Sequence, residues 1–145
     1  MRLVIQRVLE ASVEVENRQV ARIGQGLLVL VGVGREDGVE QIDWLAKKLC
    51  ELRIFEDTAG KMNLNLLDIK GEILLVSQFT LYADCSRGKR PGFEAAGKPE
   101  EANRLFNEFV KKVKVQGFQP ETGIFGADMK VQLINDGPVT IFLEK

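Results

Sequence analysis

The chain contains no histidine. Any chemistry it performs must therefore proceed without imidazole, the usual general base near neutral pH. This absence excludes hydrolases built on Ser-His-Asp or Cys-His pairs, and leaves hydroxyls, amides, backbone groups, carboxylates or a group supplied by the substrate. Cysteine is also scarce, since the chain has only Cys50 and Cys85. Two cysteines without a C-x-x-C spacing favour a reducing compartment over a disulfide framework, and we expect no metal site and no cofactor.

Strong net charge and long apolar runs are absent as well. The formal net charge is −1, so no global basic field indicates a nucleic-acid partner, although a local basic patch is compatible with it. No apolar run approaches the length that crosses a membrane, and the N-terminal segment is too polar for a signal peptide. We therefore expect a cytoplasmic protein with no membrane partner.

The length of 145 residues and the hydrophobic content of 45% fit a single domain, residues 1–145, with a proper core. Strand patterns dominate the first third. Residues 12–16 alternate strictly, Asn17-Arg18 predicts a hairpin turn, and the uninterrupted apolar run 27–31 suits a central strand covered on both faces. Further strands are predicted at residues 2–8, 19–23, 53–56, 72–76 and 128–143, the last as two strands broken at Gly137-Pro138.

Two segments have helical patterns. Asp37 is predicted to cap the first helix, with Glu40 three residues later completing a capping box. The second helix is predicted to start near Pro99, which suits a first turn. The pattern as a whole predicts an α+β fold: a strand-rich single domain, barrel-like or with a strongly twisted, mainly antiparallel sheet, and two main flanking helices.

The run Ser77-Gln78-Phe79-Thr80 follows a buried apolar strand. On an extended segment Gln78 and Thr80 share one face. Such amide and hydroxyl groups can position an ester carbonyl or a water, but they can equally satisfy neighbouring strand ends. Asp84 is the nearest candidate for a base, and nothing in the sequence places it beside them.

Two further segments are candidates for ligand contact. Gly137-Pro138 lies within a strand-like run, and the pair indicates either a turn or a rigid backbone surface without a side chain, open to a ligand. Arg87, Lys89 and Arg90 form a short basic run that is either a solvated loop or a phosphate-binding one.

A glycine-rich segment, residues 32–38, lies where a dinucleotide-binding loop would sit. Its third glycine comes one position late for G-x-G-x-x-G, and Glu36 and Asp37 would repel a pyrophosphate. We interpret it as a turn.

Taken together, Ser77-Gln78-Phe79-Thr80-Leu81 and Asn135-Asp136-Gly137-Pro138-Val139-Thr140 resemble the two signatures of the D-aminoacyl-tRNA deacylase family. The resemblance covers the whole chain, including its opening residues 1–8 and the stretch 61–65. It implies a cytoplasmic homodimer that hydrolyses the ester between a D-amino acid and the 3′ end of tRNA and rejects L-aminoacyl-tRNA.

The resemblance also implies roles for individual residues. Ser77, Gln78, Phe79 and Thr80 would form the floor of the catalytic pocket. A cis Gly137-Pro138 pair would enter the partner subunit's site as the chiral filter. The remaining expected contributors are Arg7 and Asn135, which would support that motif, and Arg87, Lys89 and Arg90, which would bind tRNA.

Because no base is evident for Thr80, we favour hydrolysis assisted by the 2′-hydroxyl of the terminal adenosine, with Thr80 and Gln78 positioning it. A filter that senses only a misplaced side chain would also accept glycyl-tRNA. The alternative is a dimeric RNA- or nucleotide-binding module without catalysis, using the basic run and the turn near Gly32.

Overall fold

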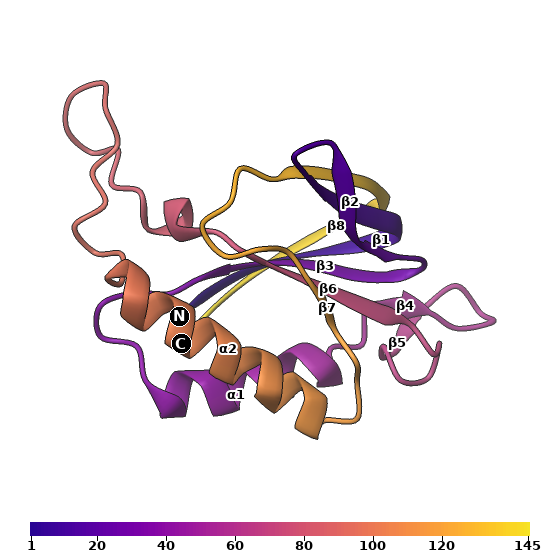
Figure 1. The fold of residues 1–145 in the computed structure, drawn as a ribbon. Helices are drawn as coiled ribbons and strands as arrows, with labels where there is room; N and C mark the ends of the chain where they lie inside the picture. Colours follow the sequence, from indigo (N-terminus) through magenta and orange to yellow (C-terminus); the bar gives the residue numbers. More distant parts are fainter.

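The computed structural model describes residues 1–145, which fold into a curled sheet with both helices on one side of it (Figure 1). The two chain ends lie next to each other, as the Met1 amino group donates to the Lys145 carbonyl at 2.7 Å. The elements in chain order are β1 (Arg2–Val15), β2 (Arg18–Ile23), β3 (Gly26–Gly32), α1 (Val39–Glu51), β4 (Phe55–Glu56), β5 (Met62–Leu64), β6 (Glu72–Ser77), the 3-10 turn η1 (Phe79–Tyr82), α2 (Pro99–Val115), β7 (Glu121–Thr122) and β8 (Lys130–Glu144).

The main sheet is organised around β1, which is long enough to pair with three other strands. It pairs antiparallel with β2, β3 and β8, and the sheet continues from β3 through the parallel strands β6 and β7. Strand β2 also contacts β6 and β7, so the sheet curls into a nearly closed barrel. This confirms the predicted strand-rich α+β fold with a mainly antiparallel sheet and two flanking helices.

The larger apolar core lies between the sheet and the helices and contains 23 buried residues. The apolar stripes of α1 and α2 supply Leu45, Leu49, Leu105 and Phe109, and strand β3 is buried along most of its length, as predicted for a central strand. A second cluster fills the inside of the curl: Val8, Ala11, Val13, Ala21, Ile23, Leu28, Leu74 and Val76.

Strand β8 runs unbroken from Lys130 to Glu144, so the predicted division into two strands at Gly137-Pro138 is wrong. Its pairing with β1 shifts register between Gln6 and Val8 and again between Val8 and Glu10. Such irregularities accommodate a proline, which has no N–H to donate to a ladder. The strand therefore passes through the Gly-Pro pair and continues.

The predicted start of α2 at Pro99 is confirmed, but the cap predicted for α1 is wrong. The N-cap residue of α1 is Gly38, whose N–H donates to Gln41 Oε1 at 2.9 Å, so Glu40 completes no capping box. The Asp37 carboxylate instead contacts Met1, Gly34 and Tyr82. No helix of the chain is long and apolar enough to cross a membrane.

Candidate active site

A cavity of about 670 Å³ opens between the end of β6, the start of α2 and the segment leading into β8. Hydrophobic residues make up 12 of the 20 that line it, so the cavity suits a largely apolar group. Its lining includes Ser77, Gln78 and Phe79 from the predicted motif, together with the aromatic residues Phe93, Phe106 and Phe125.

The motif does not have the extended geometry expected from sequence. Ser77 ends β6, but Phe79–Tyr82 turn into the 3-10 element η1. The Gln78 N–H donates to the Val31 carbonyl at 2.8 Å, which ties the segment to the end of β3. Gln78 and Thr80 still meet, because Gln78 Nε2 donates to Thr80 Oγ1. A helical turn leaves its first N–H groups without partners inside it, and Phe79, the first residue of η1, lines the cavity.

No base lies beside Thr80, whose hydroxyl contacts only the Gln78 amide. Asp84, the candidate base, accepts the Ser86 N–H at 2.9 Å and does not line the cavity. Hydrogen bonding to Ser86 lowers the pKa of Asp84, which makes it a weaker base still. The arrangement can position an ester or a water, but it offers no activated nucleophile.

Two aromatic pairs shape the cavity. The rings of Phe79 and Phe93 meet edge to face, with centroids 4.9 Å apart, and the rings of Phe106 and Phe125 are 6.3 Å apart. Phe79 keeps 57% of its surface exposed, so its ring is accessible from the cavity that it lines. The aromatic rings therefore provide stacking surfaces at the cavity.

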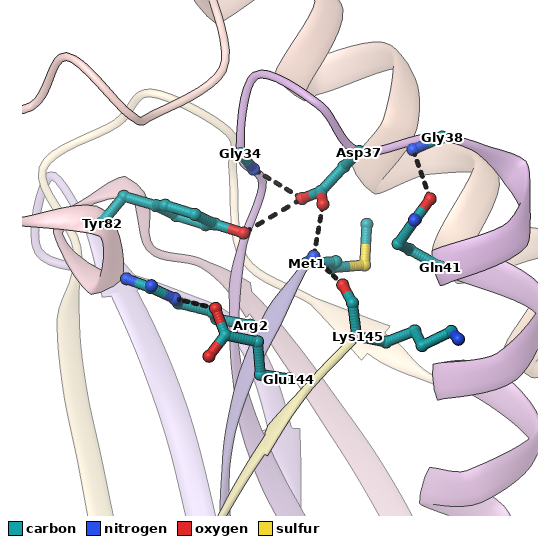
Figure 2. A network of polar contacts seen from close by, with 9 residues as sticks. All are labelled: Met1, Arg2, Gly34, Asp37, Gly38, Gln41, Tyr82, Glu144 and Lys145. Carbon is teal, nitrogen blue, oxygen red and sulfur yellow. Dashed lines mark hydrogen bonds and ion pairs between the residues drawn. The ribbon is translucent and has the colours of Figure 1, made fainter.

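A polar network holds η1 against the rest of the fold (Figure 2). The Asp37 carboxylate accepts the Gly34 N–H at 2.6 Å and the Tyr82 hydroxyl at 3.2 Å, and it also contacts the Met1 amino group. Tyr82 packs closely on Gly34, where an added Cβ would lie 2.7 Å from the phenol oxygen. These contacts fix Tyr82, the last residue of η1, to the loop before α1.

Arg2 also contacts this turn. Its Nη1 donates to the Leu81 carbonyl at 2.9 Å, and its guanidinium lies 4.3 Å from the centroid of the Tyr82 ring. Glu144 accepts from Arg2 Nε at 2.7 Å and orients the guanidinium. Burial, followed by the charge of Asp37, raises the pKa of Tyr82, so its hydroxyl remains a donor throughout the neutral range.

The second motif forms its own supported segment on β8. The Gly137-Pro138 bond is cis, and Gly137 has a φ of 130°, a backbone conformation that favours glycine. Asn135 Oδ1 accepts the Val139 N–H at 2.8 Å across the pair. The pair itself is exposed.

Arg7 contacts this segment from β1, although its side chain is almost completely buried. Its Nε donates to the Asp136 carbonyl at 3.0 Å and lies 3.2 Å from the Asp136 carboxylate. Its Nη1 donates to the Ile54 carbonyl at 2.7 Å. The structure thus brings Arg7 and Asn135 to the Gly-Pro segment, but no residue of 132–140 lines the cavity. Within one chain the two motifs stay apart.

The basic run occupies a loop that projects from the body of the fold (Figure 1). Paired hydrogen bonds between Asp84 and Gly92, both 2.8 Å, close its neck. The three exposed cations on it do not line the cavity: Arg87, Lys89 and Arg90.

The glycine-rich segment is a packed turn, as interpreted from sequence. A Cβ on Gly32 would lie 2.9 Å from the Cβ of Leu81, so η1 fills the space that a phosphate would need. No three metal-ligating side chains converge in residues 1–145. Burial raises the pKa of the Cys50 thiol to about 12, which makes this cysteine unreactive.

Sequence patterns do not reveal several residues around the site. The contacts of Asp37 with Tyr82 and of Arg2 with Glu144 join residues far apart in the chain, and no local pattern signals them. Phe106 belongs to the apolar stripe of α2, and nothing in that stripe signals that it also lines the cavity.

The chain is similar to known proteins along nearly its whole length. The sequence model described as D-Tyr-tRNA(Tyr) deacylase matches residues 4–144. A protein from Geotalea uraniireducens named D-aminoacyl-tRNA deacylase is 58% identical over 99% of this chain and 93% of its own length. One of the same name from Thermosipho africanus is 56% identical over 99% of this chain and 97% of its own length.

Solved structures share the fold. One named c-Myc DNA Unwinding Element Binding Protein superposes with a TM-score of 0.94 at 40% identity, covering 100% of this chain and 99% of the other. Another, described as a probable eukaryotic D-amino acid tRNA deacylase, gives a TM-score of 0.84 at 18% identity over 98% and 97% of the two chains, and shows the fold alone. With a family match across nearly its whole length and relatives above half identity, this chain belongs to the D-Tyr-tRNA(Tyr) deacylase family.

Proposed function

We propose that this chain is a D-aminoacyl-tRNA deacylase. It hydrolyses the ester between a D-amino acid and the 3′-terminal adenosine of tRNA, and it leaves L-aminoacyl-tRNA intact. The observation that carries this proposal is the aromatic-lined cavity that ends at Ser77, Gln78 and Phe79. Its support is the shared name of the relatives that match this chain along nearly their full length.

The terminal adenosine fits the cavity by size and chemistry. Sites for small ligands occupy about 300–1,000 Å³ and are mostly apolar, and this cavity has about 670 Å³. Any nucleic-acid base can stack on an aromatic side chain, and Phe79 and Phe93 provide aromatic rings for this. An adenine bound there puts the ribose and its ester near Ser77 and Gln78.

The chemistry uses the substrate's own hydroxyl. Water adds to the ester carbonyl, and collapse of the intermediate releases the free D-amino acid and the tRNA 3′-hydroxyl. The 2′-hydroxyl beside the ester helps to activate the water, because the chain has no histidine and Thr80 has no base. Gln78 and Thr80 position these groups, and the N–H donors at the start of η1 stabilise the developing oxyanion.

Chiral selection comes from Gly137 and Pro138. A filter for many different D-residues cannot bind any one side chain, so it must act at Cα through rigid main-chain atoms. The contacts of Arg7 and Asn135 hold the Gly-Pro segment rigid. An L-residue would direct its side chain into these fixed main-chain atoms. Glycine has no side chain that could clash with them, so glycyl-tRNA is also a substrate.

The active unit is a homodimer in which each copy completes the other's site. One chain carries both motifs but keeps Gly137-Pro138 away from its own cavity. Strand β8 pairs only with β1, which leaves one edge of a 15-residue strand open, and it exposes Ile134 and Phe142. Long open edges favour pairing with another chain. A second copy would cover these residues and bring its Gly-Pro pair to the cavity.

The projecting basic loop binds the body of the tRNA in the cytoplasm. Arg87, Lys89 and Arg90 are exposed and make no ion pair with a carboxylate of this chain, so they remain available to phosphates.

Incubation of the protein with D-Tyr-tRNA and with L-Tyr-tRNA tests the proposal. We expect free tyrosine from the D-substrate only. Binding of both tRNAs without hydrolysis of either would instead indicate a nucleic-acid-binding module, in keeping with the name of one structural neighbour.

A further inference from the structure

Two cations line the cavity of the candidate active site and have no role in the function proposed above. They are Arg35, in the loop after β3, and Lys98, the residue before α2. Both side chains are exposed. Neither belongs to the motifs that identify the family.

The backbone fixes these two cations on neighbouring segments. The Arg35 N–H donates to the Ala95 carbonyl at 3.1 Å, and the Gly97 N–H donates to the Val33 carbonyl at 2.8 Å. Gly34 and Ala96 form an isolated bridge between the same two segments. The loop before α1 is in turn anchored by the Asp37 network (Figure 2). The two positive charges therefore stand on a common, braced rim of the cavity.

The charge of this rim is not neutralised by the protein. Arg35 and Lys98 form no ion pair with a carboxylate. Other surface cations do form one, as Arg104 does with Glu101. The single acid that lines the cavity is Asp128, and it pairs with Lys130 at 2.9 Å. The cavity thus combines an aromatic, apolar interior with two unpaired cations at its edge.

A nucleotide has the complementary chemistry, with a flat base and an anionic phosphate joined by a sugar. We propose that Arg35 and Lys98 bind the phosphodiester on the 5′ side of the terminal adenosine, while the base lies among the aromatic rings. The inference rests on the proposed function, because it assumes that this nucleoside occupies the cavity. It assigns the terminal phosphate to the rim and leaves the projecting loop to phosphates farther along the tRNA.

Binding of adenosine and of 5′-AMP to the wild-type protein tests the subsite without any turnover. We expect 5′-AMP to bind more tightly than adenosine, with each of the two cations contributing about fivefold in affinity. A fivefold gain lies at the upper end of what an exposed ion pair contributes. Arg35→Ala and Lys98→Ala should each remove about fivefold from the affinity for 5′-AMP and leave that for adenosine unchanged. Lys114→Ala, an exposed cation at the other end of α2, is the matched control and should change neither.

A kinetic comparison supplies the second readout. Arg35→Ala and Lys98→Ala should lower kcat/KM for D-Tyr-tRNA but not for the D-tyrosyl ester of adenosine, which lacks the phosphate. Equal losses on both esters, no loss on either, or equal affinity of the wild type for adenosine and 5′-AMP would overturn the subsite. If the wild type hydrolyses neither ester but binds 5′-AMP through these cations, the subsite stands and the proposed reaction fails.

Discussion

Replacement of Gly34 by alanine should displace the turn that carries the first motif. The new Cβ would lie 2.7 Å from both Cζ and the hydroxyl oxygen of Tyr82, closer than carbon atoms approach in proteins. Gly34 does not have a positive φ, so the alanine backbone itself is unstrained and the cost comes from the ring. The Tyr82 side chain must move, and η1 must move with it.

The magnitude follows from the interactions that Tyr82 makes in its present position. Its hydrogen bond to the Asp37 carboxylate is worth about 1.5–3 kcal/mol, as expected for a charged acceptor. Its stacking under the Arg2 guanidinium adds about 0.5–1 kcal/mol. We therefore expect Gly34→Ala to lower the free energy of unfolding by about 2–4 kcal/mol, and kcat/KM for D-Tyr-tRNA to fall as well because Phe79 and Thr80 belong to η1.

A double-mutant cycle measured by denaturant unfolding isolates the clash. With Tyr82→Ala the ring is gone, so adding Gly34→Ala should cost almost nothing, or stabilise by up to about 1 kcal/mol through the unfolded chain. Tyr82→Phe serves as the control that removes only the hydroxyl bond. If Gly34→Ala costs the same with and without the Tyr82 ring, the packing of Tyr82 on Gly34 is not what positions η1.

Three further predictions concern the reaction. Thr80→Ala should retain substantial activity, whereas a terminal 2′-deoxyadenosine in the tRNA should abolish activity. Loss of a true nucleophile would cost about 10⁴-fold or more in rate, so single-turnover rates on both tRNAs distinguish a Thr80 nucleophile from assistance by the 2′-hydroxyl. Replacing Arg87, Lys89 and Arg90 with alanine should lower the slope of log K for tRNA binding against log salt concentration by roughly 0.7–0.9 for each phosphate that the loop no longer binds. The preference for D- over L-aminoacyl-tRNA should not change. An unchanged slope would show that this loop does not bind tRNA phosphates. Gly-tRNA should be hydrolysed at a rate closer to that of D-Ala-tRNA than to that of L-Ala-tRNA, and survival of Gly-tRNA in a time course would contradict a filter that acts by side-chain clash.

The sequence predicted correctly those elements whose signals lie within a few consecutive residues. The apolar run of β3 and the proline at the start of α2 are signals of this kind, and both elements form where expected. The predictions failed where distant contacts decide the outcome. Asp37 matches an N-cap pattern, but Tyr82, 45 residues later, provides a partner that no local pattern includes.

The same distinction applies to the candidate site. Sequence reasoning singled out the hydroxyl and amide residues of the first motif, but it did not predict that the chain turns at Phe79 and brings Leu81 close to Gly32. Gly137-Pro138 indicated a break in β8, whereas the irregular register of β1 lets the strand continue. The cations Arg35 and Lys98 reach one rim through backbone bonds between two loops, which the sequence does not predict.

The most direct test of a site built from two copies is recovery of activity by mixing two inactive variants. Ala96→Trp should block the cavity of its own chain, because Ala96 lines that cavity. Gly137→Trp should block the cavity of the partner, because Gly137 is exposed on β8 and its added indole would enter that site with the Gly-Pro pair. Circular dichroism and light scattering should first show that each variant folds and forms dimers. The variants are then unfolded, mixed in equal amounts, refolded and assayed on D-Tyr-tRNA.

A mixed dimer contains one cavity and one filter that are both intact and face each other. Half of the randomly formed dimers are mixed and each has one working site of two, so the mixture should recover about one quarter of wild-type D-Tyr-tRNA hydrolysis. Neither variant refolded alone should be active. Mixed dimers that form, as seen by native mass spectrometry, yet hydrolyse no D-Tyr-tRNA would show that the two motifs do not meet across subunits.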